Sequence, residues 1–262
     1  MASPILITGG TGTLGKQVVS RLRQTQRPLR ILSRRVHDDS DGVSFVVGDL
    51  TSGQGVGAAV NGCDTIVHLA GSAKGDDAKT STLLQAARSA DVRHLVYISV
   101  VGADRIPVRT RADWLMFGYF GYKRAAEQRI ESSGIGWTTL RATQFHDLIL
   151  MVARGMAKLP LVPTPTGIRF QPVDTGEVAE RLAALTLGEP SGIQPDLGGP
   201  RAYELKDLVG SYLRASNKQR PFVPLKVPGG AARAIRAGAN LPIDGTLGTR
   251  TWEDFLAQHV TS

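Results

Sequence analysis

The pattern of hydrophobic and polar positions predicts strands that alternate with helices over residues 1–157. Short apolar runs typical of buried strands are followed by segments with the i, i+3, i+4 spacing of amphipathic helices. The predicted strands are 5–7, 29–33, 43–47, 65–69, 94–101 and 136–141, and the predicted helices are 16–22, 55–61, 76–90, 117–132 and a last one that ends at 157. This alternation predicts an α/β fold with a doubly wound parallel sheet, helices on both faces and right-handed crossovers.

The regular alternation ends after residue 157, where Pro160, Pro163 and Pro165 indicate a loop or an edge strand. The later segments predict a strand and a helix within 170–187, a helix at 203–215, a strand at 221–227 and helices at 230–239 and 251–259. We therefore predict a larger domain, residues 1–157, and a smaller α/β region, residues 158–262, packed on it as a single compact unit.

Composition and charge narrow the class of protein. The 262 residues are 42% hydrophobic and 21% charged, which is typical of a globular chain. The net charge is +8, but the basic residues are scattered and are not interleaved with Tyr and Phe, which argues against nucleic-acid binding. The single cysteine, Cys63, excludes a disulfide framework and favours no metal cluster. With no signal sequence and no apolar run of ~18 residues, we expect a cytoplasmic protein without a membrane span.

A glycine-rich segment, residues 8–15, separates the first predicted strand from the first predicted helix. Gly9, Gly12 and Gly15 are spaced three apart. Small residues let the backbone approach a ligand, and the N–H groups at the start of a helix attract an anion. The segment therefore predicts a phosphate cradle for a dinucleotide, with a plain tight turn as the alternative. The predicted contacts are Gly9, Thr11, Gly12, Thr13, Leu14 and Gly15.

The second predicted strand ends in Ser33, Arg34 and Arg35. A fold that binds NAD places an acidic residue here to hold the ribose 2′-hydroxyl, whereas Arg suits bidentate contact with a 2′-phosphate. We therefore predict NADP(H) as the cofactor. Two alternatives stay open: the arginines are solvated surface charge, or Asp38 and Asp39 bind the ribose.

Further cofactor contacts are predicted after the third and fourth strands. Asp49 and Leu50 could receive the adenine amino group, although Asp49 could equally cap the next helix. Ala70 and Gly71 are small enough to let a cofactor lie across the sheet edge. His68, within the apolar fourth strand, is interpreted as a core histidine rather than a catalyst.

The segment after the sixth strand predicts contacts with the nicotinamide ring. Thr143 is included among the cofactor-binding residues, and Gln144 and Phe145 belong to the same expected ring pocket. A simple connecting loop is the alternative.

Tyr119 and Lys123 are four residues apart and therefore share a face of the predicted helix. A nearby ammonium favours the phenolate form of a tyrosine, which suits proton transfer at a carbonyl or an alcohol. Tyr122 is a possible substitute for Tyr119, and plain helix surface is the alternative for the pair.

Large apolar side chains near these residues predict a substrate pocket for an apolar or aromatic carbonyl, enone or quinone rather than a sugar nucleotide. Ordinary core packing is the equally weighted alternative for each side chain. The predicted pocket residues are Trp114, Phe117, Phe120, Phe145, Met151 and Met156.

Several segments together resemble the atypical and extended short-chain dehydrogenase/reductase superfamily, in its NmrA-like, NAD(P)H-binding branch. They are residues 8–15, 33–35, 48–50, 68–71, 97–99, 119–123, 140–145 and 171–174. The resemblance implies a Rossmann-like fold, an NADP(H) preference and a small C-terminal substrate region. It also implies that Ser99 orients the substrate oxygen, although the extended pattern places that hydroxyl where Val101 stands.

These observations lead to one main function and two alternatives. The main prediction is an NADP(H)-dependent oxidoreductase with catalytic Tyr119, Lys123 and Ser99, where Lys123 also binds the nicotinamide ribose. One alternative is a non-catalytic NADP(H) sensor of NmrA type, and the other is an epimerase or dehydratase on the same fold. We expect a small-molecule substrate, no metal, and a monomer or homodimer.

Overall fold

The computed structural model describes residues 2–71 and 74–260, which fall into two units. The first unit contains residues up to Ser99, Tyr122–Arg141 and Val178–Gln194. The second contains Val100–Gly121, Ala142–Glu177 and the chain from Pro195 onward. The chain thus passes between the units several times.

A sheet with the strand order β3-β2-β1-β4-β5-β6 forms the centre of the first unit. Strands β1 to β5 pair in parallel, as predicted, and the short strand β9 (Gly192–Ile193) also pairs with β6 in parallel. The strands are β1 (Ile5–Thr8), β2 (Leu29–Ser33), β3 (Val43–Val47), β4 (Thr65–His68), β5 (His94–Val100) and β6 (Gly136–Ala142).

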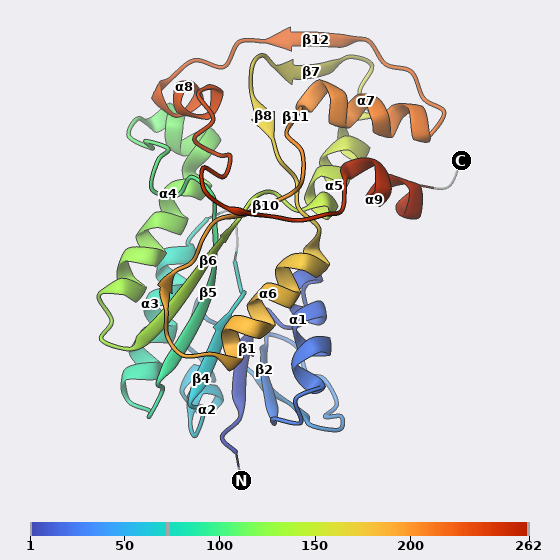
Figure 1. Ribbon diagram of the computed structural model, residues 1–262. Helices are drawn as coiled ribbons and strands as arrows, with labels where there is room; N and C mark the ends of the chain where they lie inside the picture. The colour runs from blue at the N-terminus through green and yellow to red at the C-terminus, as the bar shows by residue number, and fades with distance from the viewer. Residues whose placement is uncertain (1, 72–73, 261–262) are drawn as a thin grey trace. The chain divides into compact units, whose positions relative to one another are not determined.

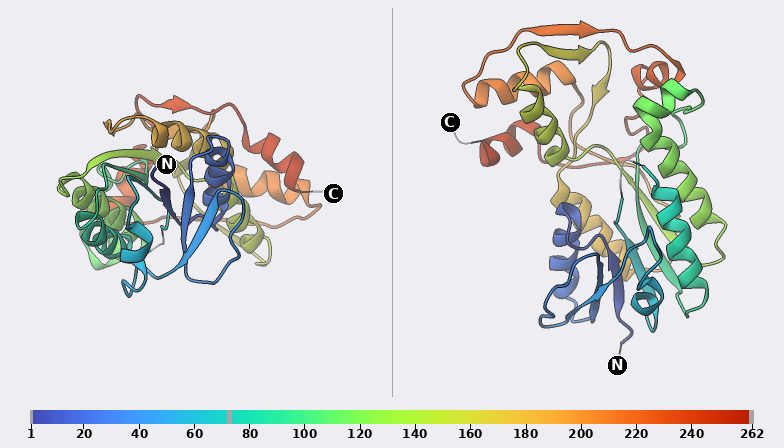
Figure 2. Two further views of the ribbon diagram at one scale, coloured as in Figure 1. Left: turned by 90° about the horizontal axis from the view of Figure 1, so that it is seen from below. Right: turned by 180° about the vertical axis from the view of Figure 1, so that it is seen from behind.

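Helices cover both faces of this sheet (Figure 1). Helices α2, α3 and α4 lie on one face and α1 and α6 on the other, as Figure 2 shows from two further sides. The core under α3 and α4 joins Leu6, Ile66 and Leu95 of the strands to Leu83 and Ile130 of the helices. The helices are α1 (Thr13–Arg23), α2 (Val56–Val60), α3 (Asp76–Arg88), α4 (Arg111–Glu131) and α6 (Thr175–Leu187).

The strand order reverses at β1, which lies between β2 and β4. In a doubly wound sheet the crevice at the carboxyl ends of the strands beside this point is where ligands bind. Thr8, the last residue of β1, pairs with Leu32 of β2 and with His68 of β4. The glycine-rich segment therefore begins at the expected ligand edge.

The second unit has two hydrophobic clusters. One joins α5, α7 and α9 around Trp252, and the other joins the first turns of α4 to α8 through Phe120 and Ile235. Its remaining elements are α5 (His146–Met156), β7 (Val162–Pro165), β8 (Arg169–Phe170), β10 (Leu197–Gly198), β11 (Tyr203–Glu204), α7 (Leu205–Ala215), β12 (Phe222–Leu225), α8 (Gly230–Arg236), β13 (Thr246–Leu247) and α9 (Trp252–His259).

The start of α4 differs from the sequence prediction. We expected irregular chain to about residue 117, but the helix begins at Arg111. Thr110 and Asp113 explain this: the Thr110 hydroxyl accepts from the Asp113 N–H at 3.1 Å, and the Asp113 carboxylate accepts from the Thr110 N–H at 3.0 Å. This reciprocal cap starts a helix that extends to Glu131.

The division into units also differs from the predicted boundary at residues 157 and 158. Segments 100–121 and 142–157, which we assigned to the first domain, belong to the second unit, whereas Val178–Gln194 belongs to the first. The reason is that α6 leads into β9, which pairs with β6 in parallel and so returns the chain to the sheet. That the two regions form one compact unit stays a prediction.

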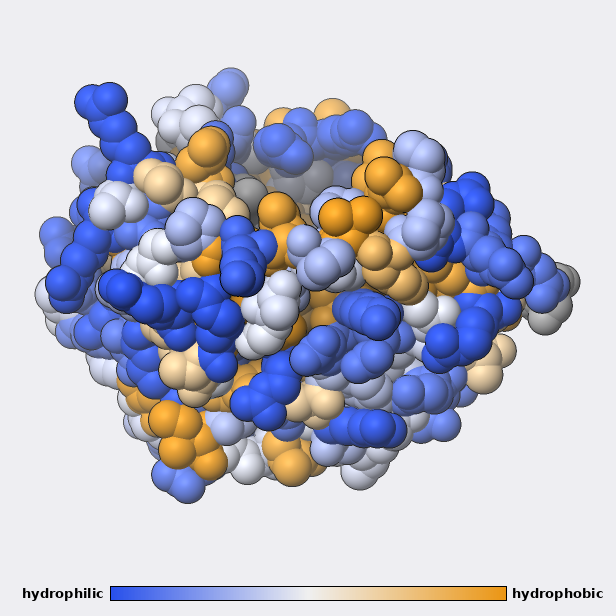
Figure 3. Space-filling model, turned by 90° about the horizontal axis from the view of Figure 1, so that it is seen from above, coloured by the Kyte–Doolittle hydropathy of each residue, from blue (hydrophilic) through white to orange (hydrophobic). Residues whose placement is uncertain are grey.

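No helix in the described part of the chain combines the length and the apolar character that crossing a bilayer requires. Figure 3 shows hydrophobic residues in several separate groups among hydrophilic ones on the face seen from above.

Candidate functional site

The glycine-rich turn is held by close contacts that exclude side chains. Gly9 has a left-handed φ of +73°, and a Cβ there would lie 2.7 Å from the backbone nitrogen of Ala70. A Cβ on Gly15 would lie 2.1 Å from the carbonyl oxygen of Gly9. Gly9 thus lets the turn pass close to β4, and Gly15 lets α1 begin directly against the turn.

The start of α1 is suited to an anion. Gly12 is the N-cap, no described side chain caps the helix, and its first turn contains no acidic residue. The first N–H groups of a helix lack carbonyl partners within the helix and lie at the positive end of its dipole. The turn therefore presents the backbone donors that a dinucleotide phosphate requires.

A cleft of about 400 Å³ opens beside this turn in the first unit. Its walls come from the carboxyl ends of β1 to β4, as expected for the crevice of a doubly wound sheet. The predicted cofactor residues that line it are Gly9, Thr11, Gly12, Ser33, Arg34, Asp49, Leu50, Ala70 and Gly71. The structure thus brings together residues from four separate segments of the sequence.

A second pocket, of about 930 Å³, shares Thr11, Ser33 and Arg34 with the cleft. Arg35 also lines it, so both predicted arginines face a cavity. The Ser33 hydroxyl accepts from the Arg35 N–H at 3.1 Å and fixes the turn between them. The described residues of this pocket include no carboxylate, so its electrostatic field favours an anion.

Some predicted cofactor residues line neither cavity: Thr13, Leu14, Gly15, Lys123 and Thr143. Sequence reasoning missed Thr51 and Lys79 of the cleft, and Lys16, Val19 and Arg23 of the larger pocket. The last three follow helical spacing along α1, a signal that could have been read.

Asp49 is not the cap of α2, because Gly55 occupies that position. One Asp49 carboxylate oxygen accepts from the Thr51 N–H at 2.8 Å, and this hydrogen bond lowers the pKa of Asp49 below its ordinary value. Asp49 therefore lines the cleft as a carboxylate, which can accept a hydrogen bond from an amino group.

Lys123 forms a buried ion pair. Its side chain is 3% exposed, and Nζ lies 2.8 Å from Oδ2 of Asp76, which is fully buried at the start of α3. Nζ also donates to the carbonyl oxygen of Ile98 at 2.9 Å and lies 4.7 Å from the centre of the Tyr97 ring. The Tyr97 hydroxyl donates to the same Asp76 oxygen at 2.9 Å.

This ion pair lies directly beneath the cleft. A Cβ on Gly71, a cleft residue, would be 3.3 Å from Lys123 Nζ and 3.6 Å from Oδ1 of Asp76. Burial opposes ionisation of Asp76, but the Lys123 ammonium outweighs it, so the pKa of Asp76 is lowered. Burial raises the pKa of Tyr97, so its hydroxyl stays protonated and donates a hydrogen bond to the carboxylate. Sequence spacing suggested Tyr119 as the partner of Lys123, whereas the ammonium is compensated by Asp76.

His68 is satisfied within the core, in agreement with its interpretation from the sequence. Nδ1 is 2.7 Å from the Thr8 hydroxyl and Nε2 is 3.1 Å from the Thr80 hydroxyl. Burial lowers its pKa to about 4, so the ring is neutral at physiological pH. Because the Ala70 N–H also donates to Thr8 Oγ1 at 3.3 Å, the histidine helps to hold the ends of β1 and β4 together.

The other predicted catalytic residues lie in different surroundings. Ser99 is buried at the end of the first unit's share of β5, and its hydroxyl has no hydrogen-bond partner among the described residues. Tyr119, in the second unit, is 38% exposed and packs edge-on against Phe120. Val101 is buried, and its N–H donates to the Ala142 carbonyl at 3.1 Å. The catalytic roles of Ser99 and Tyr119 stay predictions.

The predicted apolar pocket residues divide between two places in the second unit. Phe117 and Phe120 pack in the cluster with α8, whereas Met156 packs in the cluster with α7 and α9. Trp114 and Met151 are 42% and 63% exposed. Packing thus accounts for three of the side chains, and a role of any of these residues in substrate binding stays a prediction.

The segment predicted to contact the nicotinamide ring has defined contacts of its own. The Thr143 hydroxyl donates to the Gln171 carbonyl at 2.5 Å, and Thr143 N–H donates to Leu197. Oε1 of Gln144 is buried with no described partner, and Phe145 precedes α5 as its N-cap. These bonds fix the backbone of the segment.

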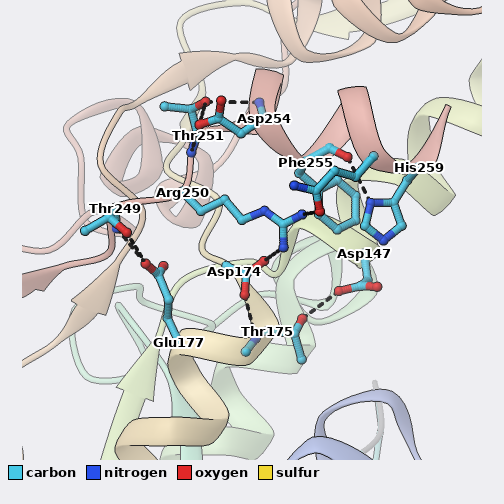
Figure 4. Close-up of polar contacts among 12 residues, drawn as sticks. Asp147, Asp174, Thr175, Glu177, Thr249, Arg250, Thr251, Asp254, Phe255 and His259 are labelled. Carbon is cyan, nitrogen blue, oxygen red and sulfur yellow. Dashed lines mark hydrogen bonds and ion pairs between the residues drawn. The ribbon is translucent and has the colours of Figure 1, made fainter.

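The motif at residues 171–174 has a structural role in the second unit (Figure 4). Oδ1 of Asp174 accepts from the Gly176 N–H at 2.7 Å and so caps α6, while Oδ2 pairs with Arg250 Nη1 at 2.7 Å. Glu177 accepts from the N–H and the hydroxyl of Thr249 at 2.7 and 2.8 Å. These contacts attach the chain after β13 to the start of α6. Within residues 2–71 and 74–260, no group of His, Cys, Asp and Glu side chains is arranged to hold a metal ion.

The cleft and the sheet define a dinucleotide-binding α/β protein, and comparison with known families shows to which family it belongs. A family model described as NAD(P)H-binding matches residues 9–149, more than half of the chain, so the protein belongs to this NAD(P)H-binding family. The match bears out the expected NAD(P)H-binding family.

Curated relatives include enzymes and an assembly factor. An NAD(P)H azoreductase of Xenophilus azovorans is 24% identical over 91% of this chain and 82% of the relative. A (4-alkanoyl-5-oxo-2,5-dihydrofuran-3-yl)methyl phosphate reductase of Streptomyces griseus is 28% identical over 85% and 77%. The photosystem II assembly factor Ycf39 of Trieres chinensis is 24% identical over 78% and 66%.

Among solved structures, the NADPH-dependent quinone oxidoreductase QOR2 of Escherichia coli, complexed with NADPH, superposes with a TM-score of 0.77. The match covers 97% of this chain and 99% of QOR2 at 19% identity. At this identity the likeness confirms the fold.

Proposed function

We propose that this protein is an NADPH-dependent oxidoreductase that reduces a small apolar carbonyl, enone or quinone. The observation that carries the cofactor choice is the end of β2, where Arg34 and Arg35 face the cavities beside the glycine turn. An acidic residue at this position would repel a 2′-phosphate, whereas two guanidinium groups attract it. The reductases among the relatives support the reaction class.

The residues present fit a dinucleotide. The glycine turn leaves no room for side chains at Gly9 and Gly15, the uncapped start of α1 presents N–H groups, and Asp49 offers a carboxylate. When bound, NADPH supplies a hydride. The chain's own residues would bind the phosphates, accept from the adenine amino group and supply a proton to the reduced substrate.

Tyr119 is the proton donor that the resemblance implies, with Ser99 orienting the substrate oxygen. For Tyr119→Phe we expect the turnover number to fall by about 10²-fold or more, because general acid catalysis contributes that much. The measurement is NADPH consumption, followed by the absorbance of the reduced nicotinamide, with a panel of carbonyls, enones and quinones as substrates. NADH is tested in parallel.

Tyr122→Phe is the matched control on the same helix. Tyr122 lies one residue from Lys123. We expect that removing the Tyr122 hydroxyl leaves the turnover number unchanged. Equal turnover of the wild type and Tyr119→Phe would remove Tyr119 from the mechanism, and a loss confined to Tyr122→Phe would transfer the role to Tyr122.

A non-catalytic NADP(H) sensor is the second candidate, and two observations favour it. Val101 stands where the extended pattern places a hydroxyl, and Asp76 compensates the charge of Lys123. Binding of NADP(H) without turnover of any substrate in the panel, and with different affinity for the oxidised and reduced forms, would favour this candidate over the reductase.

A further inference from the structure

One face of α1 forms a wall of the larger pocket. Lys16, Val19 and Arg23 follow the i, i+3, i+7 spacing of a helical stripe, and all three line the pocket. The other face of α1, with Leu14, Val18 and Leu22, is buried in the core. The helix is therefore held with its basic stripe toward the cavity.

The pocket is cationic on two walls. Arg34 and Arg35 line it from the end of β2 and the chain that follows, and Lys16 and Arg23 line it from α1. Among the described residues, this lining has no carboxylate. The nearby carboxylate of Asp39 accepts a hydrogen bond from the Phe45 N–H at 2.9 Å. This hydrogen bond partly offsets its negative charge.

The pocket is also shaped by ordered contacts. Arg23 Nη2 donates to the carbonyl oxygen of Asp41 at 3.2 Å, which ties the end of α1 to the chain between β2 and β3. His37 stacks on Phe45 with 4.8 Å between ring centres.

We propose that α1 forms the second half of the 2′-phosphate site, with Lys16 as a further residue that determines selectivity for the phosphorylated cofactor. Arg23 supports this wall by holding the chain between β2 and β3. The inference rests on the proposed NADPH preference and extends it to residues outside the predicted arginine pair. The flexible stem of a lysine suits a point-charge contact with a phosphate, beside the bidentate contacts that arginine makes.

The effect should be specific for the phosphate. Lys16→Met keeps the apolar stem and removes the ammonium. We expect about tenfold weaker binding of NADP⁺, as for one charge-assisted hydrogen bond, and no change in the binding of NAD⁺. The same contrast should hold between 2′-AMP and 5′-AMP. Because Lys16 and Arg23 are exposed, the preference for NADP⁺ over NAD⁺ should decrease as salt rises.

Arg21→Met is the matched control. Arg21 is on the same helix and carries the same charge, but its guanidinium donates to the Gln17 carbonyl at 3.1 Å and does not line the pocket. Isothermal titration calorimetry of the wild type, Lys16→Met, Arg23→Met and Arg21→Met with both dinucleotides measures the preference without a substrate. We expect Arg21→Met to behave as the wild type, and Arg23→Met to reduce the preference for NADP⁺.

The outcomes separate the two proposals. A wild type that prefers NADP⁺, with the full preference kept in Lys16→Met and Arg23→Met, would overturn this inference and leave the proposed cofactor intact. Equal weakening of NADP⁺ and NAD⁺ by Lys16→Met would also overturn it. A wild type that binds NAD⁺ more tightly, or neither dinucleotide, would overturn the proposed function and this inference with it.

Discussion

At the scale of single residues, the partner of Lys123 changes what the Tyr119–Lys123 spacing implies. A lone ammonium near a phenol would exert a strong field, but an ammonium paired at 2.8 Å with a buried carboxylate forms a nearly neutral group. Lys123 therefore supplies a fixed, compensated charge beneath Gly71. The pair also joins α3 to α4.

Breaking this pair should destabilise the protein strongly. Asp76→Asn leaves a buried ammonium without its counterion, and we expect a loss of about 3–5 kcal/mol in the free energy of unfolding. Urea unfolding followed by circular dichroism measures it. Asp77→Asn is the control, because Asp77 is in the same turn of α3 but pairs with Arg129 at 3.3 Å near the surface.

The control should cost less than about 1 kcal/mol, as surface ion pairs do. The double variant Asp76→Asn with Lys123→Met should recover part of the loss, because it removes the uncompensated charge as well. Equal effects of Asp76→Asn and Asp77→Asn would show that the burial of the pair does not matter.

At the scale of elements, α1 and the turn before it depend on Gly15. A Cβ there would approach the carbonyl oxygen of Gly9 to 2.1 Å. The oxygen belongs to the backbone and the Cβ is bonded directly to the backbone, so no side-chain rotation relieves the contact. We expect Gly15→Ala to lower the melting temperature and to weaken dinucleotide binding, because the helix must move away from the phosphate cradle.

Gly57→Ala is the matched control for this prediction. Gly57 is within α2, and a Cβ there has no described atom within 4 Å. Alanine has the higher helix propensity by about 1 kcal/mol, so this variant should be as stable as the wild type or more stable. Similar melting temperatures for the two variants would contradict the role of close packing at Gly15.

The elements show which features the sequence could predict. The strands β1 to β6 and the glycine turn follow from local patterns of apolar residues and glycines, and they were predicted nearly to the residue. The start of α4 was missed because the cap formed by Thr110 and Asp113 was not recognised within an irregular-looking segment. The partner of Lys123 could not be predicted, because Asp76 is on another helix and no local spacing connects them.

At the scale of the whole molecule, the division of the chain shows a similar limit. Periodicity identifies each element but not the layer to which it packs, so α6 was assigned to the C-terminal region although residues 178–187 belong to the first unit. The cleft was predicted from four separate segments because parallel strands bring their carboxyl ends to one edge. The apolar pocket stays a prediction, because large side chains serve core packing as readily as ligand binding.

Acid should destabilise both units through buried neutral histidines. Burial lowers the pKa of His68 in the first unit and of His146 in the second to about 4, from an ordinary value of 6.5. Between these values the unfolded chain binds more protons than the folded chain, so stability falls as pH falls. Above pH 6.5 the ring is neutral in both the folded and the unfolded chain, so the folded state keeps this full contribution to the free energy of unfolding. Each histidine contributes about 3 kcal/mol that is lost by pH 4.

His146 allows this prediction to be tested at one site. Its ring is fully buried against Trp252 and Phe255, and neither ring nitrogen has a hydrogen-bond partner among the described residues. Because His146→Phe keeps an aromatic ring and removes the titration, we expect it to be as stable as the wild type or more stable at pH 8. At pH 5 its advantage in the free energy of unfolding should grow by about 2 kcal/mol. Urea unfolding midpoints at the two pH values measure this difference. An advantage of the same size at both would mean that protonation of His146 does not oppose folding.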